Sequence, residues 1–355
     1  MTLPLLLLAL SSAPLEVRVL ERDRLTEVLL EADTFTCDGK KLLNHALSVA
    51  PNDRRLRAGE LACEVVVAEG DIRVSADNLK RRYAGKLKLT NEAEVLRLIN
   101  TVDVEDYLPS VVEPEASGSP PSALEAQAVV SRTFALASRG RHTSNGFDLC
   151  DLSHCQLYRG QTEESDASRA AVKKTANQVL LVGGVVLKPA FFHSSCGGGT
   201  SKAIDVFGEE GAGGGVSDTG KDGPLCKDAP GFAWDWSVSR IELAAALGGS
   251  PQGDISAFEI LRRDGSGRVL QLKSFGKRYS GVEFASHVGR VFGWQVFRSL
   301  HVSMEQVEGM LHFKGQGLGH GVGLCQMGAR TMAGKGADAK AILGKYFPDC
   351  QIRGF

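Results

Sequence analysis

The sequence predicts an α+β fold with a β-rich core, a few buried helices and a small αββα satellite module. Residues 15–93 contain short apolar or alternating runs, LEVRVLE, TEVLLEA, ACEVVVA and KLKLT, which are typical of strands. Residues 123–137 are almost all small or apolar, which indicates a buried helix. The chain has 41 glycines among 355 residues, and so many glycines favour tight turns and strands over a helical bundle.

Composition excludes some classes of partner. The net charge is −1 and charged residues make up 23% of the chain, so nothing indicates a nucleic acid or an anionic membrane surface. Residues 3–10 form an apolar run followed by small residues, which favours an export signal within residues 1–14 over a buried first strand. The run is too short to span a bilayer, which takes about 20 residues. Eight cysteines leave disulfides and a metal site both open.

The elements follow in order along the chain. In the strand-rich region, Cys37 and Cys63 are either ordinary thiols or a pair, and a further strand covers residues 94–100. We expect a strand-like entry over residues 107–112, then an acidic loop that carries Glu113 and Glu115. The next helix is predicted to start at Ser122, with Glu125 completing an S-x-x-E capping box.

Four possible metal ligands gather within fourteen positions after that helix, in a loop rich in Gly, Asn and Asp: His142, Cys150, His154 and Cys155. Zinc prefers such nitrogen and sulfur ligands, and three protein ligands with one open position are typical of a catalytic site. His154 directly precedes Cys155, and because adjacent residues rarely aim at one ion we leave it out of the predicted set. A Cys150–Cys155 disulfide and ordinary thiols are the alternatives.

In the second half of the sequence, we expect a helix over residues 165–176 and then a β-hairpin whose turn is Gly183-Gly184. Trp234 and Trp236 lie on one face of a strand, which favours a core position over sugar stacking. Residues 239–300 read as the αββα module, in which His287 is expected to be structural, as is His301 just after it. Alternating glycines at 315–323 predict a strand with one bare face, and helices are expected from Gln326 and over ADAKAILGKYF.

Three motifs occur in the order of a known family: EDYLPSVVEPE with ALEAQAVVSRTFA, then SSCGGGT, then GQGLGHGVGLCQMGA. In these motifs the chain, over residues 15–355, resembles the SpoIID/LytB domain family of bacterial cell-wall proteins, whose sporulation members are lytic transglycosylases. The resemblance implies that Glu115 is the catalytic acid. Ala116-Ser117 stand where the family usually has Met-Pro, one position of this loop is missing, and Cys325 and Met327 replace a common serine and tryptophan.

The resemblance also implies further site residues. His142, Cys150 and Cys155 correspond to the zinc ligands of some members, and Cys226 is a candidate disulfide partner of Cys196. The implied substrate-binding residues are Gln156, Tyr158, Ser195, Thr200, His320 and Gln326. For Gln156 and Tyr158, a structural role in which the buried amide and phenol satisfy backbone groups is an equal alternative, and His320 could instead orient the catalytic carboxylate. The expected layout is a core over residues 15–238 and 301–355, interrupted by the module at 239–300, in a protein exported to the cell envelope or periplasm.

The sequence offers one acid within a matching motif, Glu115, and this number distinguishes two mechanisms of glycan cleavage. Glycosidases ordinarily use two carboxylates, whereas a lytic transglycosylase needs one, because the muramic acid C6 hydroxyl of its substrate is the nucleophile. A Ser195 or Cys196 nucleophile is disfavoured because the G-x-S-x-G elbow is missing. Two alternative functions remain. One is an amidase enhancer that binds glycan strands or a cell-wall amidase without cleaving the glycan, and the other is a hydrolase that uses zinc-activated water.

Overall fold

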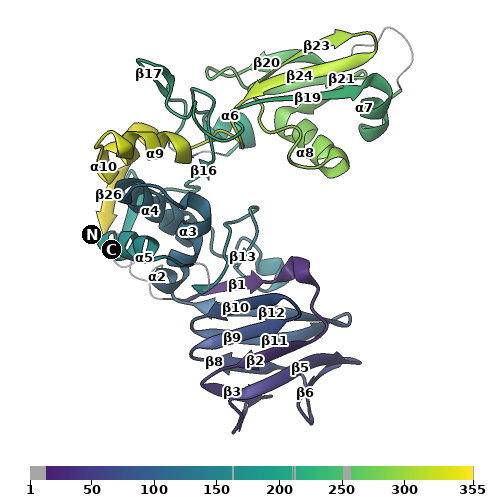
Figure 1. Ribbon diagram of the computed structural model, residues 1–355, viewed down its shortest axis with the longest axis vertical. Helices are drawn as coiled ribbons and strands as arrows, with labels where there is room; N and C mark the ends of the chain where they lie inside the picture. Colours follow the sequence, from purple (N-terminus) through teal and green to yellow (C-terminus); the bar gives the residue numbers. More distant parts are fainter. Residues whose placement is uncertain (1–12, 162–163, 210, 212, 251–256, 355) are drawn as a thin grey trace. The chain divides into compact units, whose positions relative to one another are not determined.

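The computed structural model describes residues 13–161, 164–209, 211, 213–250 and 257–354, and it confirms the predicted β-rich α+β class. The predicted export signal at 1–14 lies almost wholly outside this range. The chain forms two compact units, Met1–Val179 with Ile352–Phe355, and Leu180–Gln351 (Figure 1). The domain boundaries expected at residues 238 and 300 do not fall at this division and stay a prediction. Across the described ranges, no helix is both long and apolar enough to cross a membrane.

The first unit contains two β-sheets in which most neighbouring strands are antiparallel (Figure 1). The seven-stranded sheet has the order β13-β1-β12-β11-β8-β3-β4, with bounds β1 (Leu15–Val19), β3 (Thr34–Cys37), β4 (Lys40–Leu42), β8 (Val66–Glu69), β11 (Lys86–Glu92), β12 (Val95–Val102) and β13 (Leu149–Cys150). The six-stranded sheet has the order β10-β9-β2-β5-β6-β7, with bounds β2 (Val28–Glu31), β5 (Ala46–Asn52), β6 (Arg55–Ala58), β7 (Leu61–Cys63), β9 (Ile72–Ala76) and β10 (Leu79–Tyr83).

Alternating side chains explain why these sheets pack face to face. Buried and more exposed residues alternate along β1, β2, β6 and β11, so each strand presents one apolar face to the other sheet. Cys37 of β3 and Cys63 of β7 form a disulfide that joins the two sheets. Of the two alternatives open for these cysteines, the structure shows the pair.

Helices α2 (Val104–Tyr107), α3 (Pro109–Ala116), α4 (Pro121–Ala137) and α5 (Asp166–Lys174) pack together in the first unit. The expected strand at 107–112 is wrong. Its apolar residues Tyr107, Leu108, Val111 and Val112 recur at helical spacing, the Asp103 side chain caps α2, and Pro109 starts α3. The expected acidic loop is therefore helical, and Glu115 lies in the last turn of α3.

The long helix α4 is buried along almost its whole length, as predicted. It begins at Pro121 with Pro120 at its N-cap, so Ser122 is not the cap and the predicted capping box with Glu125 does not form. Pro fits the first helical turn because its missing N–H has no helical partner there. The Glu125 carboxylate accepts a hydrogen bond from Lys174 Nζ of α5 at 2.7 Å instead.

The second unit contains short sheets and five helices within its described residues. Its strands are β14 (Gln178–Val182, which crosses the division), β15 (Val185–Val186), β16 (Phe192–His193), β17 (Thr219–Gly220), β18 (Gly223–Pro224), β19 (Ala233–Ser239), β20 (Glu259–Arg263), β21 (Val269–Ser274), β22 (Lys277–Ser280), β23 (Val302–Val307), β24 (Met310–Gln316) and β25 (Leu324–Cys325). Its helices are α6 (Ala203–Phe207), α7 (Arg240–Ala246), α8 (Gly281–Phe292), α9 (Gln326–Gly334) and α10 (Ala339–Tyr346). Strand β26 (Gln351–Gly354) closes the described chain.

The predicted module shares its core with neighbouring strands. Between α7 and α8 the chain forms three strands, β20-β21-β22, one more than the αββα pattern predicts. One apolar cluster joins these elements to the sheet β19-β24-β23, and Phe284, Phe313 and Leu243 are fully buried in it. Trp234 is buried in this cluster and Trp236 packs against it, so both tryptophans are core residues as predicted.

The glycine-rich stretch after β24 is not the predicted strand, because β24 ends at Gln316. Gly317, Gly319, Gly321 and Gly323 all have positive φ, which interrupts strand geometry and makes an irregular loop. A Cβ at Gly317 would lie 2.6 Å from the Ser195 carbonyl oxygen, so this position also needs glycine for a close approach. The loop and the SSCGGGT segment lie side by side, since β16 pairs with β25 and Ser195 pairs with Leu318.

Candidate functional site

Glu115 is held in place by the chain segment that follows the Cys/His cluster. Its Oε1 accepts a hydrogen bond from the backbone N–H of Leu157 at 3.0 Å. The residue is half-buried at the end of α3, whose Val111 and Val112 are fully buried. The carboxylate is therefore partly open to solvent but fixed in orientation by a backbone donor.

An ion pair between Arg132 and Glu105 links helices that pack against α3, the helix that carries Glu115. The Arg132 side chain of α4 is fully buried, and its Nε and Nη2 donate to the two carboxylate oxygens of Glu105 in α2 at 2.7 and 2.8 Å. Its remaining donors reach the carbonyl oxygens of Gln178 and Val172. Because the guanidinium is satisfied from several elements, α2, α4 and α5 are fixed against one another.

Glu113, the other acid of the motif, has a structural environment. Ser117 Oγ donates to Glu113 Oε1 at 2.9 Å, and Ser165 Oγ donates to Glu113 Oε2. Ser165 is the N-cap of α5, so Glu113 ties the end of α3 to the start of α5. The geometry distinguishes the two acids, and Glu115 is the one beside the Cys/His segment.

The Gln156 and Tyr158 side chains are buried and hydrogen-bonded within the protein, which favours the structural alternative over substrate binding. The Gln156 amide is buried, its Oε1 accepts from Tyr107 Oη at 3.1 Å and its Nε2 donates to the Ser131 carbonyl oxygen at 3.3 Å. The buried Tyr158 hydroxyl donates to Asn100 Oδ1 at 2.8 Å. Burial raises the pKa of both Tyr107 and Tyr158 well above the ordinary value, so the hydroxyls stay protonated donors. Gln156 therefore links α2 to α4, and Tyr158 links its own segment to β12.

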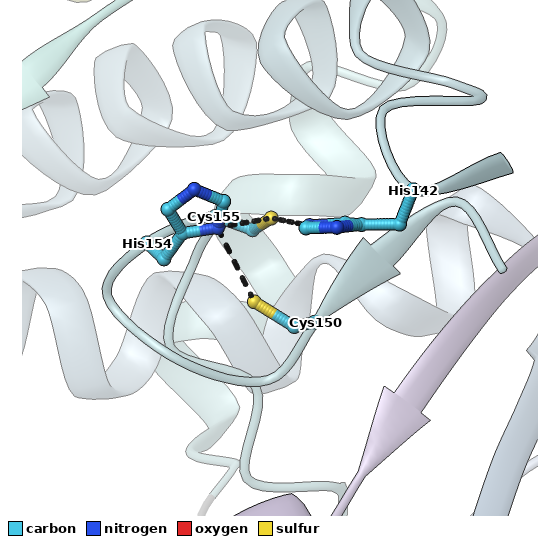
Figure 2. A group of neighbouring side chains, drawn as sticks. All are labelled: His142, Cys150, His154 and Cys155. Atoms are coloured by element: carbon cyan, nitrogen blue, oxygen red, sulfur yellow. Dashed lines mark hydrogen bonds between the residues drawn. The ribbon is translucent and has the colours of Figure 1, made fainter. Parts of the chain in front are cut away.

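His142, Cys150, His154 and Cys155 form one cluster, which we call the first cluster. Figure 2 shows the four side chains converging on a common centre, and their ligand atoms all lie within 4.8 Å of one another. His142 Nε2 is 3.3 Å from Cys155 Sγ, and His154 Nδ1 is 3.8 Å from Cys150 Sγ and 3.7 Å from Cys155 Sγ. Neither cysteine is in a disulfide, so that alternative is wrong.

The local chain explains this convergence. His142 precedes the 3-10 turn η2 (Thr143–Asn145) and its ring stacks on Phe147, while Cys150 lies in β13 beside β1. The hydrogen bond from Cys155 lowers the pKa of the Cys150 thiol, which favours a thiolate in the cluster. His154 is the residue that the sequence reasoning excluded. The tight turn after β13 brings His154 to the same centre as Cys155, so His154 is a candidate fourth ligand, and the three-ligand set stays a prediction.

His320 lies in the second unit among aromatic rings. Its ring centroid is 5.2 Å from Phe207, 5.5 Å from Phe191 and 5.6 Å from His193, and its Nδ1 accepts from the Val322 N–H at 3.0 Å. Burial lowers the pKa of His320 to about 4, so the imidazole is neutral at neutral pH. Phe191, Phe207 and His320 are each half-buried, and together they make a partly open aromatic group.

The other predicted binding residues of this unit differ in exposure. Thr200 is buried and its Oγ1 accepts from the Val216 N–H at 3.1 Å, and Ser195 is buried with its hydroxyl lacking a hydrogen-bond partner among the described residues. Both side chains are buried, so their role as direct ligands stays a prediction. Gln326 is half-buried at the first position of α9, so it keeps access to the surface.

Known proteins resemble this chain over much of its length. A family model described as stage II sporulation protein SpoIID matches residues 92–181, which include Glu115 and the first cluster. An uncharacterised protein of Brachyspira hyodysenteriae is 28% identical over 318 residues, covering 88% of this chain and 83% of that protein. Stage II sporulation protein D of Bacillus amyloliquefaciens is 26% identical over 72% of this chain and 75% of its own length.

A third relative is an amidase enhancer of Bacillus subtilis, 23% identical over 66% of this chain and 38% of its own length. The family model and two of the named relatives thus point to the same sporulation and amidase-enhancer proteins. These comparisons support the resemblance to the SpoIID/LytB family and a role related to the bacterial cell wall.

Proposed function

We propose that this protein is a peptidoglycan lytic transglycosylase in which Glu115 is the single general acid and base. The observation that carries the proposal is the Glu115 carboxylate itself, half-buried on α3 and oriented by the Leu157 N–H within the segment that matches SpoIID. The neighbouring acid, Glu113, is engaged by Ser117 and Ser165. A reaction that needs one carboxylate is consistent with this arrangement.

The proposed reaction transfers one proton out and one proton back. Protonated Glu115 donates to the oxygen that joins C1 of N-acetylmuramic acid to N-acetylglucosamine, and that C–O bond breaks. The C6 hydroxyl of the same muramic acid then bonds to C1, and its proton passes to the Glu115 carboxylate. The products are a 1,6-anhydromuramic end and a free N-acetylglucosamine end, water is not consumed, and Glu115 returns to its starting form.

The first cluster fits a zinc ion. Zinc–ligand distances of about 2.0–2.3 Å in a tetrahedron separate ligand atoms by about 3.3–3.8 Å. The three distances between a histidine nitrogen and a cysteine sulfur given above for the cluster run from 3.3 to 3.8 Å. His142, Cys150, His154 and Cys155 would hold the ion with no open position. When bound, it would supply cross-linking rather than activated water, which disfavours the zinc-hydrolase alternative.

This site would position Glu115 through the backbone. Cys155 is two residues before Leu157, whose N–H holds the carboxylate. Fixing Cys155 to Cys150 and His142 would restrict the same short segment, so the orientation of Glu115 would depend on it. His142, Cys150, His154 and Cys155 are therefore proposed as positioning residues.

Glycan binding is proposed for the aromatic group of the second unit. Sugar rings have apolar faces that pack on aromatic side chains, and Phe191, Phe207 and His320 offer such faces beside a neutral imidazole. Gln326 is the amide that would hydrogen-bond a sugar hydroxyl. We also propose export to the cell envelope or periplasm, and the Cys37–Cys63 disulfide supports an oxidising compartment.

The test is digestion of purified peptidoglycan glycan strands, with and without stem peptides, by the wild type, Glu115→Gln and the matched control Glu113→Gln. Mass spectrometry should find anhydromuramic products with the wild type and the control, and none with Glu115→Gln. Loss of activity in both variants would refute the specific assignment to Glu115.

A second function has its own supporting observation. One relative is named an amidase enhancer. The alternative function is therefore that of a non-catalytic protein that binds glycan strands and a cell-wall amidase. If the wild type binds glycan strands, yields no anhydromuramic ends and raises the rate of an added cell-wall amidase, this alternative replaces the transglycosylase.

A further inference from the structure

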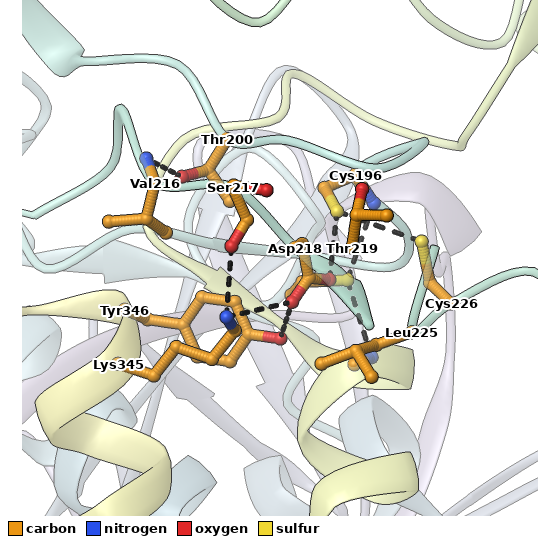
Figure 3. A network of polar contacts seen from close by, with 12 residues as sticks. Cys196, Thr200, Val216, Ser217, Asp218, Thr219, Leu225, Cys226, Lys345 and Tyr346 are labelled. Carbon is orange, nitrogen blue, oxygen red and sulfur yellow. Dashed lines mark hydrogen bonds and ion pairs between the residues drawn. The ribbon is translucent and has the colours of Figure 1, made fainter. Parts of the chain in front are cut away.

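A second group of possible metal ligands lies wholly inside the second unit. Cys196, Asp218, Cys226 and Cys325 are all buried, and their ligand atoms lie within 4.8 Å of one another. We call them the second cluster. Figure 3 shows Cys196, Asp218 and Cys226 directed toward one another from separate segments. None of the three cysteines is in a disulfide.

The sulfur geometry differs from that of a disulfide. Cys196 Sγ and Cys226 Sγ are 3.6 Å apart, whereas bonded sulfurs are about 2.05 Å apart. Two thiolates on one tetrahedral zinc ion, at Zn–S distances of about 2.3 Å, are about 3.8 Å apart. The separation therefore fits two ligands of one ion, and the disulfide that the family resemblance implied for this pair is absent.

Backbone N–H groups surround the sulfurs. Cys325 Sγ accepts from the N–H groups of Cys196 and Gly328, each at 3.3 Å, and Cys196 Sγ accepts from the Gly198 N–H at 3.4 Å. Such donors stabilise negative charge on sulfur, which is the form that binds a metal. A buried thiol that served only as packing would need no such donors.

Asp218 is oriented as a ligand. Its Oδ1 accepts from Tyr346 Oη at 2.8 Å and lies 3.9 Å from Lys345 Nζ, while its Oδ2 is 3.0 Å from Cys196 Sγ (Figure 3). One carboxylate oxygen is thus held by outer partners and the other is directed at the sulfurs. Ligating carboxylates in metal sites are commonly braced in this way.

A buried cation provides an independent observation. The Arg268 side chain is fully buried, and among the described residues it makes no ion pair. It donates to the carbonyl oxygens of Cys196 and Gly199 and to Ser266 Oγ, and the nearby Asp264 carboxylate accepts from the Arg268 backbone N–H at 3.0 Å. A buried guanidinium needs nearby negative charge. One divalent ion with three thiolates and one carboxylate keeps about two negative charges, which Arg268 and Lys345 would balance.

We propose that Cys196, Asp218, Cys226 and Cys325 bind a second zinc ion as a structural site with three sulfur ligands and one oxygen ligand. Cys196 follows β16, Asp218 and Cys226 flank the β17–β18 hairpin, and Cys325 ends β25 just before α9. The ion would therefore join the SSCGGGT segment to the glycine loop that carries His320. This proposal does not depend on the transglycosylase activity.

The test counts zinc ions and their ligands. Native mass spectrometry of the full chain, purified with zinc and without chelators, should show two zinc ions per chain. The double variant Cys150→Ser/His154→Ala removes the first cluster and should keep one zinc. X-ray absorption at the zinc edge of that variant should give three sulfur neighbours at about 2.3 Å and one oxygen neighbour.

Variants in the second cluster provide the reverse comparison. Cys226→Ser should lose one zinc from the wild-type count, and Cys350→Ser should lose none, because Cys350 is a free cysteine outside both clusters. Should Cys226→Ser fail to fold, the measurement on Cys150→Ser/His154→Ala decides alone. No zinc in that folded variant, a shell of two sulfurs and two nitrogens, or a Cys196–Cys226 disulfide found by peptide mapping of the unreduced protein would each overturn the proposal.

Discussion

Replacing His154 by alanine tests the composition of the first cluster most sharply. The sequence favours three ligands, His142, Cys150 and Cys155, whereas His154 Nδ1 lies 3.7 Å from Cys155 Sγ and 3.8 Å from Cys150 Sγ. If His154 is a fourth ligand, its removal opens one position that water fills less well. The zinc dissociation constant of this site should then rise.

The expected magnitude follows from the ligand count. Structural zinc sites bind with about 10–16 kcal/mol, so each of four ligands contributes about 2.5–4 kcal/mol. Water entering the vacated position recovers part of this, because the His154 side is exposed to solvent. We therefore expect a loss of about 2–3 kcal/mol, which raises the dissociation constant about 30- to 150-fold.

The assay is competition for zinc with a chromogenic chelator at neutral pH, with His142→Ala as the comparison and the exposed His45→Ala as the control. His154→Ala and His142→Ala should raise the dissociation constant of the first-cluster zinc by similar factors, and His45→Ala should leave that constant unchanged. An unchanged zinc dissociation constant in His154→Ala, together with a raised one in His142→Ala, would refute the four-ligand site and support the three-ligand prediction.

Three further outcomes are expected. Glu105→Gln leaves the buried Arg132 guanidinium without its carboxylate and should destabilise the first unit by about 3 kcal/mol in urea unfolding; a change below about 1 kcal/mol would contradict the role of this pair. Cys37→Ser/Cys63→Ser opens a link that spans 26 positions and should cost about 3.5 kcal/mol, seen as an earlier unfolding midpoint than that of the unreduced wild type. Burial lowers the pKa of His320 to about 4, so between about pH 6.5 and pH 4 the unfolded chain takes up a proton that the folded chain does not. Stability should therefore fall as pH falls through this window, and thermal unfolding of His320→Gln should depend less on pH there.

The strands and the long helix could be predicted because their signals are local. Alternation along β1 and β11 reflects one buried face, and the apolar length of α4 reflects burial on all sides. The helix α5 begins at Ser165, which caps it through its side chain. By contrast, the short apolar run at 107–112 favours a strand by its length, although its pairs of apolar residues four positions apart are a helical signal.

Motif matching could locate the site but could not assign roles within it. Gln156 and Tyr158 stand in a recognisable motif, yet both are buried and satisfied by Tyr107, Ser131 and Asn100. A motif retains residues that build a site together with residues that touch a ligand, and only burial separates the two kinds.

The first and second clusters show the limit set by distance along the chain. The first cluster lies within fourteen positions and was visible in the sequence, except for His154, whose place depends on a turn. In the second cluster Cys196 and Cys325 are 129 positions apart and Asp218 is an ordinary loop acid in the sequence. Only the pairing of β16 with β25 brings the two cysteines together.

The most direct test of the central claim is digestion of peptide-stripped glycan strands in water labelled with oxygen-18, with the products analysed by mass spectrometry. If Glu115 transfers the C6 hydroxyl proton as proposed, the wild type should yield anhydromuramic ends without the label, and Glu115→Gln should yield neither kind of product. New muramic reducing ends that carry oxygen-18 would show that water is the nucleophile, and would contradict the single-carboxylate transglycosylase account.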